Sequence, residues 1–117
     1  MMTGVQIFGT RKSSDTRKAQ RFFSERRVPV HFVDLTERAA SLGELRRFAQ
    51  KFGVRALVDS ESRRFRELGL GAAMLSDDRW LDTLVEEPLV LRIPLVRRGN
   101  DLTVGLAEDV WRSWMAQ

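Results

Sequence analysis

Apolar positions in the first part of the chain change their spacing twice, which predicts a strand, a helix and a second strand. The short apolar run at residues 5–8 is typical of a buried strand. After a polar loop at residues 10–14, the chain up to about Glu25 places apolar side chains on one helical face and cations on the other. Residues 28–33 are β-branched and alternating, with Pro29 at a strand start or a sheet edge. This order predicts a βαβ unit with parallel strands.

The middle of the chain has the pattern of three helices. Ser41 and Glu44 form a capping box that opens a helix ending at Gly53. Its predicted apolar face consists of Leu45, Phe48, Ala49 and Phe52. A second helix is predicted over about residues 62–68. A third is capped by residues 76–78 and precedes Pro88. Its predicted apolar face consists of Trp80, Leu81, Leu84 and Val85.

The last part predicts a hairpin and a final helix. Residues 89–96 are expected to form a strand, residues 98–101 a turn and residues 102–106 the partner strand. A helix follows from about Glu108, and its Val110, Trp111 and Trp114 are expected in the core. The whole order is β-α-β, a helical insertion at about residues 41–87, then β-β-α. It predicts one thioredoxin-like α/β domain over residues 1–117, with a mixed four-stranded sheet.

Composition fits a globular domain and leaves two interpretations of its charge open. Of 117 residues, 43% are hydrophobic and the charged 31% are interspersed among them. No apolar run approaches the ~20 residues that span a bilayer. A signal-peptide pattern is also absent, so a cytoplasmic protein without membrane contact is expected. The net charge of +4 fits an acidic partner of the basic first helix and Arg26-Arg27, or a solvated, salt-bridged surface.

The absence of cysteine restricts the chemistry most. With no Cys and one His, disulfides, thiolate zinc sites and thiol nucleophiles are excluded. No dinucleotide-binding fingerprint is present either, so no cofactor and no metal are expected.

The loop between the first strand and the first helix is a candidate anion site. Backbone N–H groups after Thr10, the Ser13 and Ser14 hydroxyls and the Arg11 and Lys12 side chains are suited to phosphate or sulfate. In the structural alternative, Ser13 or Ser14 only caps the helix and the two cations are solvated. A catalytic role for Ser13 would need a base such as Asp15, or a triad with His31 and Asp34.

Several segments carry a family resemblance. Residues 8–13, Phe-Gly-Thr-Arg-Lys-Ser, are similar to an aromatic-Gly-x-x-x-Cys segment, and residues 17–19 continue it as Arg-Lys-Ala. Residues 53–57 are similar to a segment with an anion-binding arginine, and residues 91–96 to a Leu-x-Arg-Pro-Ile-Val strand. With these motifs in order, the chain resembles the arsenate reductase family, ArsC with its Spx and YffB relatives. The resemblance implies a thioredoxin-like fold, an anion-binding role for Arg55 and a cis proline at Pro94.

At most positions where the family has its catalytic residues, this chain has other residues. Ser13 stands where the family has its nucleophilic cysteine, and Ile93 where it has the arginine before the cis proline. Arg92 is displaced by one residue, which on a strand means the opposite face. Gly105 stands at a further arginine of true arsenate reductases. Of the family's catalytic set, Arg55 remains.

Two functions follow from this comparison. The resemblance without the thiol implies a non-redox binding or regulatory domain, and its Spx branch implies the RNA polymerase α subunit as a partner. The alternative is a reductase-like enzyme acting on an oxyanion or thiol substrate with altered chemistry. Direct nucleic-acid binding is not expected, because the chain has no Tyr and its Phe and Trp fall on predicted core faces.

Overall fold

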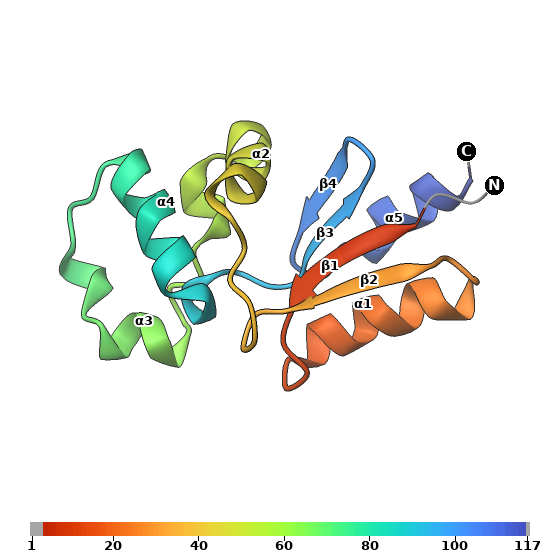
Figure 1. The fold of residues 1–117 in the computed structure, drawn as a ribbon, viewed down its shortest axis with the longest axis horizontal. Coiled ribbons are helices and arrows are strands. Elements are labelled where there is room, and N and C mark those ends of the chain that lie inside the picture. Colours follow the sequence, from red (N-terminus) through yellow and green to blue (C-terminus); the bar gives the residue numbers. More distant parts are fainter. Residues whose placement is uncertain (1–3, 117) are drawn as a thin grey trace. The chain divides into compact units, whose positions relative to one another are not determined.

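The computed structural model describes residues 4–116, which fold into two compact units (Figure 1). The sheet unit comprises the described residues of Met1–Asp34 and Ile93–Gln117, and the helical unit comprises Leu35–Arg92. That the whole chain acts as one thioredoxin-like domain stays a prediction. The expected absence of a signal peptide also stays a prediction, because it involves residues 1–3, which lie outside the described residues.

The sheet unit contains the predicted mixed four-stranded sheet. Its elements in chain order are β1 (Val5–Gly9), α1 (Ser14–Glu25), β2 (Val30–Asp34), β3 (Leu95–Arg98), β4 (Asp101–Val104) and α5 (Glu108–Met115). The strand order is β2-β1-β3-β4, with β1 and β2 parallel and the other pairs antiparallel. The prediction of a β-α-β segment and a β-β-α segment joined in one sheet is confirmed.

One face of this sheet, the helix face, packs on α1 and α5. Because strand side chains alternate, Val5 and Ile7 of β1 lie on it together with Val96 of β3. The ring centroids of Phe23 and Trp111 lie 5.3 Å apart, so the two helices share one aromatic cluster with the sheet. The Trp111 indole N–H donates to Thr103 Oγ1 over 2.8 Å, which satisfies the buried polar ends of both side chains.

Gly9 allows α1 to approach the end of β1. A Cβ at this position would lie 2.6 Å from Thr16 Cγ2 and would overlap Thr16 Oγ1. Thr16 is fully buried, so neither residue has room to move. The loop between β1 and α1 therefore starts from a close contact between strand and helix.

The helical unit begins with the predicted capped helix. Its elements are α2 (Leu42–Phe52), the 3-10 helix η1 (Val54–Leu57), α3 (Arg63–Glu67), η2 (Leu70–Ala72), α4 (Asp77–Glu86) and η3 (Pro88–Val90). Both hydrogen bonds of the Ser41–Glu44 capping box are present, and Ser62 and Ser76 cap α3 and α4. Local side-chain chemistry thus starts each α-helix of this unit, and the caps of α2 and α4 were predicted from the sequence.

A paired arginine joins α3 to the end of α4. Arg64 donates to both carboxylate oxygens of Glu87, over 3.0 and 2.7 Å. This hydrogen bonding by Arg64 is the main reason why the pKa of the Glu87 carboxyl lies below its ordinary value. Glu87 is therefore held in its charged form by the ion pair.

The predicted hairpin boundaries are wrong. Residues 88–90 form η3, Leu91 makes an isolated bridge with Val58, and β3 starts only at Leu95. Proline explains both changes, because Pro88 favours a first helical turn and Pro94 has no N–H for a ladder. The predicted second strand at residues 102–106 is in fact β4 at Asp101–Val104, since Gly105 has a φ of 76°.

Two predicted core residues and one strand start are also wrong. Val110 is 44% exposed, because Trp111 and Trp114 define the buried face of α5. Phe52 is 36% exposed at the end of α2, where Lys51 Nζ lies 5.3 Å from its ring centroid. β2 starts at Val30 instead of the predicted residue 28. The carbonyl of Pro29, just before the strand, accepts the Val5 N–H.

Candidate functional site

The loop after β1 is closed by hydrogen bonds of Ser13. The Ser13 N–H donates to the Thr10 carbonyl over 3.2 Å, and Thr10 is buried. The Ser13 hydroxyl oxygen accepts the Thr16 N–H over 3.1 Å, in the extended conformation of a helix N-cap. Ser13 thus has the capping role that the sequence left open, whereas the exposed Ser14 is the first residue of α1.

Arg11 of this loop is already paired. Its Nε lies 3.4 Å from Asp34 Oδ2, and its guanidinium lies 5.4 Å from the centroid of the Phe32 ring. The Arg17 guanidinium donates to the Arg11 carbonyl over 2.7 Å, which adds a second cation below the loop. Lys12 is exposed. The Asp34 carboxylate therefore competes with any anion for Arg11.

Some hydrogen-bonding capacity remains at the start of α1. Within residues 4–116, the backbone N–H groups of Lys12 and Ser14 have no hydrogen-bond acceptor. The helix dipole favours an anion here, and Asp15 in the first turn already supplies one negative charge. The loop keeps the backbone geometry of an anion site while much of its charge is balanced.

Pro94 lies beside the start of this loop. The Ile93–Pro94 peptide bond is cis, and the Pro94 carbonyl accepts the Gly105 N–H over 2.8 Å. Continuing the antiparallel register of β1 and β3 places Pro94 opposite Gly9. The candidate cis proline thus belongs to the same unit as the loop.

Arg55 belongs to the helical unit. It lies in η1, is exposed, and its guanidinium lies 5.2 Å from the centroid of the Trp80 ring. It lines a pocket of about 320 Å³ together with Phe65, Trp80 and Arg92. Arg55 therefore lies in the helical unit, whereas the other candidate residues, those of the loop, lie in the sheet unit.

Arg92 is the residue that sequence reasoning misplaced. It was expected on the opposite face of a strand, but it precedes β3, and its N–H donates to the Leu57 carbonyl over 2.7 Å. This bond brings Arg92 beside η1, so it lines the same pocket as Arg55. The pocket is therefore lined by two guanidinium groups and, among the described residues, by no carboxylate. The signal that could have found it is Pro94, which interrupts the ladder before strand alternation applies.

The proposed triad of Ser13, His31 and Asp34 is not assembled. His31 and Asp34 are three residues apart on β2, so their side chains lie on opposite faces of the sheet. Asp34 faces Arg11, and His31 is exposed. Ser13 therefore has no aligned histidine base.

The described part of the chain contains neither a cluster of metal-ligating side chains nor a membrane-spanning helix. Among residues 4–116, no group of three or more His, Asp or Glu side chains is arranged to hold a metal ion. None of the helices described is long and apolar enough to cross a bilayer.

Comparison with protein families decides the relationship. The model of the ArsC family matches residues 8–114, nearly the whole chain. The chain belongs to the ArsC family. The predicted family is thereby confirmed for a chain that contains no cysteine.

Relatives of this ArsC-family chain include enzymes and regulators. The uncharacterized protein YusI of Bacillus subtilis is 26% identical over 84% of this chain and 86% of its own length. An arsenate reductase of Neisseria meningitidis is 26% identical over 89% of this chain and 92% of its own length. The global transcriptional regulator Spx 2 of Oceanobacillus iheyensis is 26% identical over 95% of this chain and 83% of its own length. The family therefore includes both functional classes.

Solved structures confirm the thioredoxin-like ArsC fold. An arsenate reductase from Vibrio cholerae superposes with a TM-score of 0.83 at 26% identity, covering 96% of this chain and 98% of the other. A YffB protein superposes with a TM-score of 0.85 at 20% identity, covering 93% and 96%. This ArsC-family chain shares their architecture.

Proposed function

We propose that this ArsC-family chain is a non-redox binding or regulatory domain. The observation that carries the proposal is the Ser13 hydroxyl, which accepts the Thr16 N–H over 3.1 Å in a chain with no cysteine. A hydroxyl at the family's thiol position is far less acidic than a thiol and forms no disulfide. The regulators among the relatives support the regulatory class.

Serine needs an activating base before it can act as a nucleophile. The hydrogen bond to Thr16 uses the Ser13 oxygen as an acceptor, and His31 lies on the far side of the sheet from Asp34. The family's thiol chemistry therefore has no direct replacement at this loop.

The proposal includes weak binding of phosphate or sulfate, with candidate residues in each unit considered separately. In the sheet unit its candidates are Thr10, Arg11, Lys12, Ser13 and Ser14, with the free N–H groups of the loop as donors. In the helical unit its candidate is Arg55, supported by the neighbouring Arg92. We also propose a cytoplasmic protein whose partner, by its Spx resemblance, is the RNA polymerase α subunit.

The enzymatic alternative is tested by turnover. We expect purified protein to reduce neither arsenate nor a disulfide substrate in the presence of glutathione and glutaredoxin. Ser13→Cys is expected to gain disulfide exchange, because the start of α1 lowers the pKa of a thiol there, and Ser14→Cys is the matched positional control. Turnover by the cysteine-free protein would overturn the non-redox assignment and favour the altered-chemistry enzyme.

The anion site is tested by thermal unfolding. Phosphate or sulfate is expected to raise Tm, and Arg55→Ala is expected to reduce that rise. Arg47→Ala removes an exposed arginine of α2 that lines no described pocket with Arg55 and serves as the control. Equal stabilisation of both variants would contradict a role for Arg55. Recovery of RNA polymerase subunits with the tagged protein from native extract tests the partner separately.

A further inference from the structure

The sheet face opposite α1 and α5 changes character along β1. Phe8 pairs in register with Val33 and Leu95, and these three side chains form a buried apolar row. Two residues earlier on β1, Gln6 pairs with His31 of β2 and Arg97 of β3. We call this second set the polar row, because it has three hydrogen-bonding side chains where the first row has three apolar ones.

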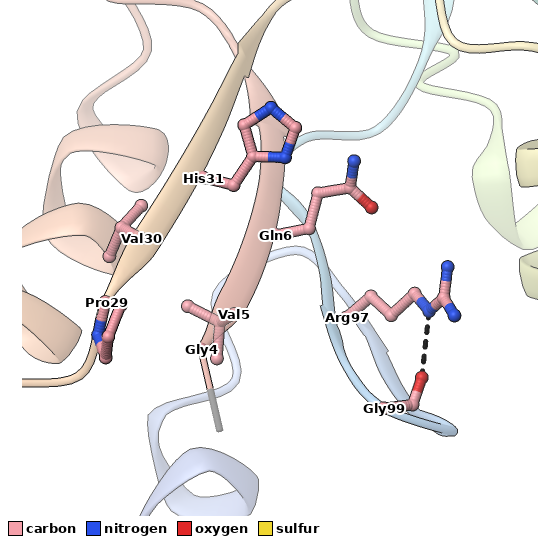
Figure 2. A pocket seen from close by; sticks show the side chains of 8 residues that line it. All are labelled: Gly4, Val5, Gln6, Pro29, Val30, His31, Arg97 and Gly99. Carbon is pink, nitrogen blue, oxygen red and sulfur yellow. Dashed lines mark hydrogen bonds between the residues drawn. The ribbon is translucent and has the colours of Figure 1, made fainter. Parts of the chain in front are cut away.

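The polar row lines a shallow pocket of about 410 Å³ (Figure 2). Figure 2 shows the side chains of His31, Gln6 and Arg97 extending to the same side of the sheet. Gly4, Pro29 and Gly99 also line the pocket and contribute no charged side chain. The size of the pocket falls in the range of small-molecule sites, roughly 300–1,000 Å³.

The polar groups of this pocket have unused hydrogen-bonding capacity. Arg97 Nε donates to the Gly99 carbonyl over 2.8 Å, which fixes the guanidinium at the pocket wall. Its two terminal nitrogens have no partner among the described residues, and the same is true of the Gln6 amide and the His31 imidazole. Donors from three strands are thus available to one ligand.

The charge of the pocket is one-sided. The acidic residues within the strands are Asp34 and Asp101. Both share their strand face with residues of the helix face, Asp34 with Phe32 and Asp101 with Thr103. The pocket therefore contains the Arg97 charge without a lining carboxylate, which complements an anion.

We infer that this pocket binds a small organic oxyanion, a molecule carrying a carboxylate or phosphate group. The terminal nitrogens of Arg97 receive the oxyanion as a fork, and the Gln6 amide donates beside them. Since neighbouring strands lie about 4.8 Å apart, His31 is two strand spacings from Arg97 and reaches a second polar group of the ligand. This site is independent of the loop and of Arg55.

The single histidine makes the pocket directly observable. Its imidazole gives one set of NMR signals, which are followed while inorganic phosphate or succinate is added at constant ionic strength. A saturable shift is expected with at least one of the two probes. Tighter binding of succinate identifies a carboxylate ligand, and tighter binding of phosphate identifies a phosphate ligand.

Variants separate this site from general charge effects. Arg97→Gln is expected to weaken binding roughly tenfold or more, because a charge-assisted hydrogen-bonded fork is lost. Gln6→Ala is expected to weaken binding less, while Arg47→Gln, at an exposed position of α2, leaves the His31 response unchanged. Thermal unfolding of each variant without ligand identifies those that fail to fold. A linear, non-saturating shift with both probes, or equal saturation in folded Arg97→Gln, would overturn the inference.

Discussion

The two ends of β1 carry similar polar groups in opposite states. Where β1 ends, Arg11 is paired with Asp34 and the Ser13 hydroxyl accepts the Thr16 N–H. Where β1 begins, Gln6 and its neighbours His31 and Arg97 face a pocket without a carboxylate. The first end carries the family resemblance, whereas the second has the larger unused capacity for a ligand.

This difference separates groups that stabilise the fold from groups that are available to a ligand. The strand-to-helix loop keeps its backbone without a thiol at position 13, because the cap and the close contact at Gly9 stabilise the fold itself. The polar row does not stabilise the core, since Val5 and Ile7 on the other face do so. Polar groups without a structural partner are therefore the better guide to binding.

The largest effect is expected from Gly9→Ala at the end of β1. The added methyl group collides with the buried Thr16, and we expect a loss of about 1–3 kcal/mol in the free energy of unfolding. Gly43→Ala is the matched control, because no atom lies within 4 Å of the added Cβ in α2. The control is expected to stabilise by roughly 0.5–1 kcal/mol. Urea unfolding measures both, and an equal response of the two variants would contradict the close contact.

Ser13→Ala tests whether this residue still serves a structural role. Loss of the N-cap is expected to cost about 1 kcal/mol of stability, while Ser13→Asp retains an acceptor for the Thr16 N–H. Ser14→Ala, at an exposed position inside α1, is the control. If Ser13→Ala keeps full stability but loses phosphate binding, Ser13 is a ligand residue and the comparison of the two ends must be revised.

The sequence predicted what local chemistry determines. Ser13, Ser41, Ser62 and Ser76 each have a hydroxyl that caps the following helix, so helix starts could be found without tertiary information. The mixed four-stranded sheet was predicted from the order of strands and helices along the chain. The family motifs then indicated the architecture that the solved relatives confirm.

The sequence could not predict what depends on neighbours distant along the chain. Leu89 and Val90 were predicted in a strand but lie in η3, and the Arg92 N–H donates to the Leu57 carbonyl. The polar row was missed because Gln6, His31 and Arg97 become neighbours only through the register of three strands. The pairing of Arg11 with Asp34 likewise depends on where β2 ends.

Glu87 extends the comparison to a paired arginine of the helical unit. Hydrogen bonds from Arg64 hold the pKa of Glu87 below 4.5, so the pair stabilises the fold above that pH and this contribution disappears as pH falls through the lowered pKa. Glu87→Gln is expected to unfold at a lower urea concentration than the wild type at pH 7, with the difference diminishing as pH falls through the lowered pKa of Glu87. Glu86→Gln, on the same helix, is the control. A difference that is independent of pH would show that the ion pair does not cause it.

Asp34→Asn changes the state of the loop directly. Removing this charge leaves Arg11 without its ionic partner, so phosphate is expected to raise Tm more in the variant than in the wild type. The change in stability without phosphate is expected to be roughly 0–1 kcal/mol, because the Arg11 side chain is 72% exposed. Asp101→Asn removes a carboxylate from the other end of the sheet and controls for net charge. If both variants gain equally from phosphate, Asp34 does not occupy the anion site, and the two ends of β1 differ in geometry alone.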